Sequence, residues 1–298
     1  MKRLIVSALL LTAGSALVLA GSALMSTAQA ELPYAKERIE WNKPLAPFHV
    51  IGNIYYVGMA GVSTFLIVTP KGDILTDGGL PESAEAIEKN IQTLGFKLSD
   101  IKILLNSHAH FDHSGALAKL KADTGAKFYA SAGDKPFLES GHITYGLSSQ
   151  IDTTPVHVDH VVKEGTKVKL GGVTLMAHMT PGHTTGDTTW TMSLTEDGVA
   201  HKVMFFGSLT VAAPLIGNTA YPQIASDYRA SFAKLKKMDA DIFLAPHGEQ
   251  FEMADKLAKM KPGAPNPFID AGSKDRVLAK MEKDFDRQLA KDQAAAKP

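Results

Sequence analysis

The 298-residue chain contains no cysteine. It therefore forms no disulfide, carries no lipid on a cysteine and offers no thiolate to a metal. Any metal site must be built from nitrogen and oxygen donors, which histidine and carboxylate side chains supply. The sequence also lacks internal repeats and any low-complexity linker between two domains. Since 45% of its residues are hydrophobic, the chain can bury a large core, as one large domain or as two fused halves.

An excess of positive charge is absent as well. The chain has 31 basic and 31 acidic residues, with no basic run and no basic face with interleaved aromatic residues. Binding to a phosphate backbone requires such clustered positive charge. We therefore expect no nucleic-acid partner, and a small molecule as the substrate.

Residues 1–30 have the features of a signal peptide. A basic start precedes an apolar run over residues 4–25, and Ala28-Gln29-Ala30 places small residues where signal peptidase needs them. The run is long enough to span a bilayer, so an uncleaved anchor is the alternative. We expect cleavage before Glu31, a mature chain of net charge −2, no stable membrane association, and a secreted, periplasmic location.

The mature chain, residues 31–298, is expected to form a single domain. Three prolines predict an extended N-terminal arm over residues 31–47, with Trp41 either packing on the body or contacting substrate. Apolar residues at helical spacing predict a C-terminal helix over about residues 274–290. The tail from Lys291, rich in alanine and lysine, is expected to fray.

Between these ends, short β-branched and aromatic runs alternate with glycine and proline turns. Strands are predicted at residues 50–51, 54–57, 64–68, 73–76, 101–105, 128–130, 167–170, 173–178, 189–194, 202–206 and 242–245, and helices at 82–94, 115–124, 222–237 and 253–260. The pattern of strands followed by a helix occurs twice, roughly before and after residue 155. It therefore predicts two similar halves packed together.

The most informative stretch is residues 106–115, between a predicted strand and a predicted helix. Four groups able to bind a divalent metal lie here within six residues: His108, His110, Asp112 and His113. If such groups were buried only for packing, each would need a polar partner. On a helix His108 and His110 would point apart, whereas in a loop they can converge on one ion and leave the other two for a second. A solvated histidine-rich turn is the alternative.

Two more histidines also follow predicted strands directly. His183 lies in Thr180-Pro181-Gly182-His183-Thr184, and His247 lies in Pro246-His247-Gly248. Asp77 stands at another strand end, beside two glycines. Strand ends at one edge of a sheet can assemble a site on a rigid scaffold, so we expect these loops to meet the motif at 106–115.

This pattern resembles the metallo-β-lactamase superfamily, whose motif HxHxDH is matched by His108-Ala109-His110-Phe111-Asp112-His113. The resemblance covers nearly all of residues 41–270. It implies a mixed α/β fold, the αββα sandwich with two similar halves, and a site at one edge that holds two zinc ions per chain. The implied ligands are His108, His110 and His183 for the first zinc, and Asp112, His113 and His247 for the second.

Position 208 separates the subfamilies. The resemblance implies that glyoxalase II, RNase Z-like nucleases and many lactonases carry a metal-bridging aspartate in a Gly-Asp-x-Leu context. This chain has Gly207-Ser208-Leu209 there. The resemblance likewise implies that subclass B1 and B2 β-lactamases carry a cysteine at this position, which this chain lacks. Ser208 together with His113 is similar to the subclass B3 pattern, as are the stretches at residues 53–58 and 76–80.

The resemblance implies hydrolysis of the strained amide of a β-lactam. Bulk water, with a pKa of ~15.7, is too protonated to attack at neutral pH, and zinc lowers this value to ~7. Asp112 is expected to orient the hydroxide while binding the second zinc. Ser208 is expected to hydrogen-bond metal-bound water and Thr210 to donate to a substrate carboxylate, although either hydroxyl could cap a turn. Asp77 either orients a ligating imidazole or caps a turn.

Two other functions stay open. One is a lactone or small-ester hydrolase of the same fold, which the missing aspartate at position 208 disfavours. The other is a non-catalytic zinc-binding module. For each of these functions we expect a monomer.

Three further features carry less weight. Residues 140–154 form a long polar loop that either flanks the substrate or is plain surface. The segment Ser231-Phe232-Ala233-Lys234 matches the S-x-x-K motif of serine β-lactamases, but no Lys-Thr-Gly accompanies it, so we expect a chance match. The six remaining histidines lack metal-ligand spacing and are expected to be structural: His49, His142, His157, His160, His178 and His201.

Overall fold

Two β-sheets form the centre of the protein in the computed structural model, which describes residues 33–296. The predicted signal peptide, residues 1–30, lies outside these described residues. Within them, no helix combines the length and the apolar character that crossing a membrane requires.

The first sheet has seven strands in sequential order. The pairs from β1 to β4 are antiparallel, and those from β4 to β7 are parallel. β5 is buried at four of five positions, as expected for a central parallel strand covered on both faces. The strands are β1 (Phe48–Ile51), β2 (Ile54–Tyr56), β3 (Phe65–Ile67), β4 (Asp73–Thr76), β5 (Ile101–Leu105), β6 (Lys127–Ser131) and β7 (His160–Val162).

The second sheet has five strands in the order β12-β11-β10-β9-β8. Its first four strands in sequence pair antiparallel, and β12 then pairs parallel to β11. The strands are β8 (Lys167–Leu170), β9 (Val173–Met179), β10 (Thr188–Glu196), β11 (Val199–Phe205) and β12 (Ile242–Leu244).

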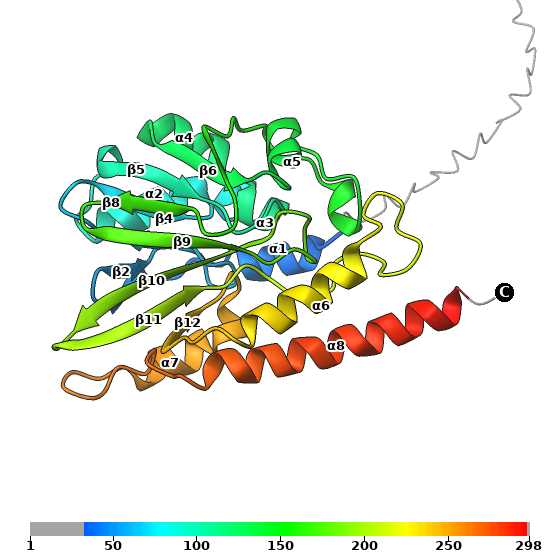
Figure 1. Ribbon diagram of the computed structural model, residues 1–298. Coiled ribbons are helices and arrows are strands. Elements are labelled where there is room, and N and C mark those ends of the chain that lie inside the picture. Colours follow the sequence, from blue (N-terminus) through cyan, green and yellow to red (C-terminus); the bar gives the residue numbers. More distant parts are fainter. Residues whose placement is uncertain (1–32, 297–298) are drawn as a thin grey trace, which may run out of the picture. The chain divides into compact units, whose positions relative to one another are not determined.

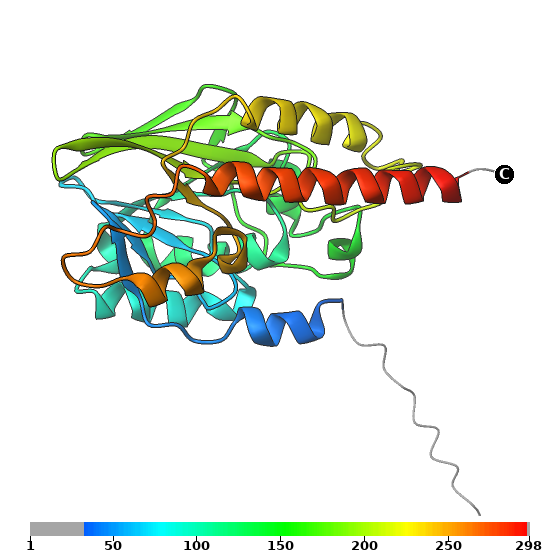
Figure 2. The same cartoon turned by 90° about the horizontal axis from the view of Figure 1, so that it is seen from below.

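Helices cover the outer faces of the two sheets (Figure 1). α2 and α4 lie over the first sheet, and α6 and α8 run side by side over the second (Figures 1 and 2). One hydrophobic cluster includes buried residues from both sheets and both helix layers. The helices are α1 (Ala35–Trp41), α2 (Ala84–Thr93), α3 (Phe111–Ser114), α4 (Leu117–Thr124), α5 (Lys135–Ser140), α6 (Ile224–Leu235), α7 (Met253–Lys259) and α8 (Ser273–Ala295).

This architecture confirms the predicted αββα sandwich and its two similar halves. Each half starts with an antiparallel meander and then crosses through a helix to a parallel strand. In the first half α2 links β4 to β5, and in the second half α6 links β11 to β12. β7 still belongs to the first sheet, so the division between the sheets falls after residue 162.

Three local predictions were wrong. The segment 31–47 was expected to be extended, but it contains α1, which Trp41 and the preceding Tyr34 fix by packing on Phe111. The tail from Lys291 is helical as far as Ala295 rather than frayed, because the side chain of Asp292 accepts a hydrogen bond from the Leu215 N–H. Residues 106–115, expected to be a loop between a strand and a helix, are not purely a loop, since Phe111–Ser114 form α3.

Candidate metal centre

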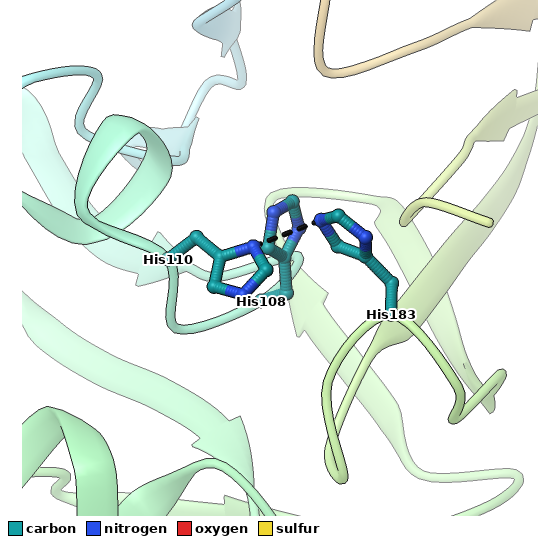
Figure 3. A group of neighbouring side chains, drawn as sticks. All are labelled: His108, His110 and His183. Atoms are coloured by element: carbon teal, nitrogen blue, oxygen red, sulfur yellow. Dashed lines mark hydrogen bonds between the residues drawn. The ribbon is translucent and has the colours of Figure 1, made fainter. Parts of the chain in front are cut away.

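Three of the predicted ligands come together in loops at strand ends of the two sheets. His108 and His110 follow β5, and His183 lies in the connection from β9 to β10. His110 Nδ1 is 2.9 Å from His183 Nε2, and the ring of His108 lies against both (Figure 3). One nitrogen from each of these three rings falls within 4.8 Å of the others. We call these three side chains the first group.

The outer nitrogens of two of these rings have partners that fix their orientation. His108 Nδ1 is 3.0 Å from Ser107 Oγ, and His183 Nδ1 is 2.7 Å from the carbonyl oxygen of Thr210. His108 Nε2 is buried and has no hydrogen-bond partner among the described residues. A buried ring nitrogen without a partner, facing two other imidazoles, fits a nitrogen ligand of a divalent metal.

The other three predicted ligands form a second group beside the first. Asp112 Oδ2 is 3.3 Å from His113 Nε2 and 3.4 Å from His247 Nε2. The two ring nitrogens are 3.2 Å apart. Asp112 and His113 lie on α3, whereas His247 follows β12 on the other sheet. Ligand atoms of His108, Asp112 and His113 also lie within 4.8 Å of one another, so the two groups adjoin.

Burial and mutual charge set the protonation of both groups. Burial lowers the pKa of His110 to about 4, and burial together with the neighbouring histidines lowers the pKa of His108. Burial alone would raise the pKa of Asp112, but the charges and hydrogen bonds of His113 and His247 hold it well below its usual range. The first group therefore presents neutral imidazoles, because burial lowers the pKa of His183 as well, and Asp112 presents a carboxylate; these are the forms that bind metal ions. Burial alone would lower the pKa of His113, but the charge and the hydrogen bond of Asp112 raise it.

Both groups open into a cavity of about 230 Å³. Trp41 forms part of its wall, with its ring centroid 5.2 Å from that of His247. Ser148 adds a second wall, so the loop at 140–154 does reach the site. A larger cavity of about 640 Å³, between the β10–β11 hairpin and residues 260–269, contains none of the predicted ligands.

Asp77 caps the turn that leads into the motif. Its Oδ1 accepts hydrogen bonds from the Ser107 N–H at 2.7 Å and from the Asn106 side chain at 3.0 Å. The backbone after Asp77 also contacts α3, since the Gly78 N–H donates to the carbonyl oxygen of His113 at 2.7 Å. A Cβ on Gly78 would approach the Leu117 nitrogen to 2.8 Å, so glycine is needed there. Of its two predicted roles, the geometry supports turn capping.

The two predicted substrate hydroxyls lie on the loop after β11. Thr210 lines the cavity, and its Oγ1 is 3.3 Å from His183 Nδ1. Ser208 is buried, with its Oγ 3.2 Å from Thr210 Oγ1. Thr210 can therefore reach a molecule in the cavity, and Ser208 can orient Thr210.

Sequence reasoning missed two buried aspartates behind the first group. Asp187 Oδ2 lies 3.8 Å from His108 Nδ1, and burial raises the pKa of this carboxyl well above its usual range. Asp134 accepts hydrogen bonds from both histidine-bearing loops, and burial raises its pKa to about 7. Asp187 lies four residues after His183, and this proximity was a weak indication that it belongs to the site. The sequence offers no such indication for Asp134.

The features given a structural expectation have local partners away from the cavity. His142 pairs with Asp152, and His157 pairs with Glu139. Ser231 of the S-x-x-K segment donates to the carbonyl oxygen of Pro181. Its hydroxyl is therefore engaged inside the fold and does not line the cavity.

Comparison with known proteins gives a consistent set of relatives. The family model described as the metallo-β-lactamase superfamily matches residues 57–247. The structure of BJP-1, a subclass B3 metallo-β-lactamase of Bradyrhizobium japonicum, superposes with a TM-score of 0.83 at 46% identity and covers 86% of this chain and 98% of its own. FEZ-1, a metallo-β-lactamase from Legionella gormanii, superposes with a TM-score of 0.82 at 38% identity and covers 85% and 98%.

The curated relatives are more distant. "Probable metallo-hydrolase YqgX" of Bacillus subtilis is 25% identical over 73% of this chain and 96% of its own length. A hydroxyacylglutathione hydrolase of Rhodospirillum rubrum is 31% identical over 36% of this chain and 34% of its own. The family match, the subclass B3 neighbours and the sandwich fold agree with one another, and the predicted resemblance is confirmed. The chain belongs to the metallo-β-lactamase superfamily and is a hydrolase of that superfamily.

Proposed function

We propose that this protein is a zinc-dependent β-lactamase that opens the four-membered ring of β-lactam antibiotics. One observation carries this proposal: two adjoining groups of nitrogen and carboxylate donors open into one cavity, in a chain that aligns with nearly all of a subclass B3 enzyme. A closed structural metal site would not face a cavity, so the arrangement disfavours a non-catalytic zinc-binding module.

The first group, His108, His110 and His183, would hold one zinc ion, and the second group, Asp112, His113 and His247, would hold another. When bound, zinc supplies a Lewis acid that polarises the carbonyl group and lowers the pKa of water to about 7. The donor set fits zinc because imidazole nitrogen and carboxylate oxygen are its usual ligands when no thiolate is available.

The remaining steps fall to side chains of this protein. Asp112 directs Oδ2 at the rings of His113 and His247, and its Oδ1 can accept a hydrogen bond from the attacking water. That bond aims the water at the carbonyl carbon, which contributes by orientation. Thr210 Oγ1 donates to the carboxylate of the substrate and is itself oriented by Ser208.

We also propose the cellular setting. Residues 1–30 act as a signal peptide that is removed, and the mature protein works in the periplasm as a monomer. Its partner is a β-lactam rather than a nucleic acid or a membrane. Cell fractionation and the mass of the secreted protein test these points, because retention of residues 1–30 would indicate a membrane anchor.

Chelation and zinc reconstitution test the proposed activity. The mature protein is assayed with a penicillin, a cephalosporin and a carbapenem before and after dialysis against a strong chelator. We expect turnover of at least one β-lactam, its loss after dialysis, and its return with zinc. Activity that survives chelation would overturn the metal mechanism, and the absence of turnover on all three would overturn the substrate class.

A lactone or small-ester hydrolase is the second candidate. The hydroxyacylglutathione hydrolase match favours it, but that match covers only about a third of each chain. Ser208 also stands where the resemblance places a metal-bridging aspartate in such enzymes. Rates on a homoserine lactone and on a thioester, measured beside the penicillin assay, decide between the two candidates.

A further inference from the structure

The carboxylate of Asp134 joins the two loops that carry the first group. Asp134 follows β6 and is 1% exposed. Its Oδ2 accepts hydrogen bonds from the Ala109 N–H at 2.9 Å and from Thr184 Oγ1 at 2.8 Å. Its Oδ1 accepts one from the Gly186 N–H at 2.9 Å. We call these three hydrogen bonds the Asp134 clip.

The partners in the clip are the immediate neighbours of the first group. Ala109 stands between His108 and His110, and Thr184 directly follows His183. The first loop belongs to one sheet and the second to the other. Asp134 is therefore a single side chain that ties the two halves together beside the point where the three imidazoles converge.

Close packing leaves these loops little room to rearrange around the clip. A Cβ on Gly186 would lie 2.0 Å from Ser131 Oγ and 2.3 Å from the Asp134 nitrogen. Thr185 Oγ1 also donates to the carbonyl oxygen of Gly133 at 2.9 Å. The turn at 131–134 thus fits directly against residues 184–186, which fixes where the carboxylate sits.

The clip uses both side-chain oxygens of Asp134 as acceptors. Two of its partners are backbone N–H groups, which can only donate, and all three point at acceptor oxygens. An asparagine would place its NH₂ group against at least one of these donors, whichever way the amide is turned. A buried N–H would then lose its partner, and the loop that carries it would have to move.

We propose that Asp134 is a positioning residue that holds His108 and His110 in register with His183 and so sets the zinc affinity of the first group. This inference rests on the proposed function, because it assumes that the first group binds zinc. Asp134 does not line the cavity, so we assign it no contact with substrate or metal. The second group makes no bond to the clip, so its affinity should be independent of Asp134.

Zinc titration of the metal-free protein, in competition with a chromophoric chelator, tests this role without an activity assay. Loss of a hydrogen bond that supports a ligand typically weakens metal binding by 10- to 100-fold. We expect Asp134→Asn to weaken one of two zinc sites by about that factor and to leave the other unchanged. Thr184→Val removes one bond of the clip and should weaken the same site by less, whereas Thr184→Ser keeps the hydroxyl and should bind as wild type does.

Asp159→Asn provides the matched control. Asp159 also accepts a backbone hydrogen bond next to β6, from the Phe128 N–H at 2.9 Å, but at the start of the strand and away from the histidines. This variant should bind both zinc ions normally even if it unfolds at lower denaturant concentration. Weakening of zinc binding in Asp159→Asn equal to that in Asp134→Asn would show a general effect of stability and overturn the proposal.

The outcomes separate this inference from the proposed function. A wild-type protein that binds no zinc overturns both. A wild type that binds two zinc ions, with Asp134→Asn unchanged, overturns the inference alone. If Asp134→Asn fails to fold, the pair Thr184→Val and Thr184→Ser decides, and equal zinc affinity in that pair overturns the inference.

Discussion

The two halves follow the same path through space but contribute unequally to the metal centre. β5 and β12 are equivalent strands, since each pairs in parallel after a helical crossover. The loop after β5 carries four predicted ligands, whereas the loop after β12 carries His247 alone. The two halves therefore provide two similar strand ends, but most of the predicted metal ligands follow β5.

The surroundings of the ligands differ as well. His108 is fully buried, and the preceding Asn106 and Ser107 donate hydrogen bonds to Asp77. The side chain of His247 is 16% exposed and faces the cavity beside Trp41. The first-half ligands His110 and Asp112 also line the cavity but are only 5% and 6% exposed, so the two halves should respond differently to the loss of a ligand.

The largest effect is expected from His110→Ala. This change removes a ligand nitrogen from the first group, and because His110 is only 5% exposed, water replaces its ring less well than that of His247. We expect kcat/KM for a penicillin to fall by more than about 100-fold, beyond the loss usual for a supporting residue. Steady-state kinetics with zinc analysis measures both. A fall of less than tenfold would mean that the first-half loop is not the main ligand source.

His247→Ala should have a smaller effect. Water from the cavity can take the place of the lost imidazole, so we expect a fall in kcat/KM of about 10- to 100-fold and weaker retention of one of two zinc ions. His142→Ala, which removes an exposed histidine paired with Asp152, is the control and should change neither quantity. An effect of His247→Ala equal to that of His110→Ala would remove the contrast between the halves.

Acid should destabilise the metal-free protein through the first-half loop. Burial lowers the pKa of His110 to about 4, whereas in the unfolded chain it is near 6.5. Between these values the unfolded state binds more protons, so stability falls as the pH drops through this window. We expect His110 to contribute about 3 kcal/mol to that fall. Urea unfolding at pH 7 and pH 4 should show a weaker pH dependence in His110→Asn than in wild type, and parallel curves would contradict the assignment.

The smallest effects compare the loops that follow β4 and β11. Asp77→Ala leaves the buried Ser107 N–H without its acceptor and should lower the free energy of unfolding by about 1 to 3 kcal/mol. Ser208→Ala removes a hydroxyl bonded to another hydroxyl and should cost about 0.5 to 1 kcal/mol. Urea unfolding checks both. Asp77→Asn keeps an acceptor and should stay near wild type, so a large loss there would exclude simple capping.

Much of this site could be predicted because its signals are local in sequence. The spacing of His108, His110, Asp112 and His113 is recognisable without a structure, and so is an apolar strand before each histidine-bearing loop. The structure brings all six predicted ligands together. The apolar pattern of the sequence also predicted the central strands, because β5 is apolar at almost every position.

The features that were missed depend on tertiary contacts. α1 has no fully buried residue of its own and is fixed by aromatic contacts with α3, so a polar segment rich in proline gave no helical signal. β7 is a three-residue strand at the edge of the sheet with two exposed positions. Asp134 is a lone carboxylate whose partners are 25 and 50 residues away, and only the folded chain shows what it joins.

The placement of the two tryptophans has a practical consequence. Trp190 is buried in the core and donates its indole N–H to the carbonyl oxygen of Asn106, whereas Trp41 lies 5.2 Å from the ring of His247. Indole fluorescence is sensitive to a neighbouring imidazole and to the charge that it carries. The protein therefore contains a built-in optical probe at the cavity and an internal reference in the core, which allows ligand binding and unfolding to be followed separately in one unlabelled sample.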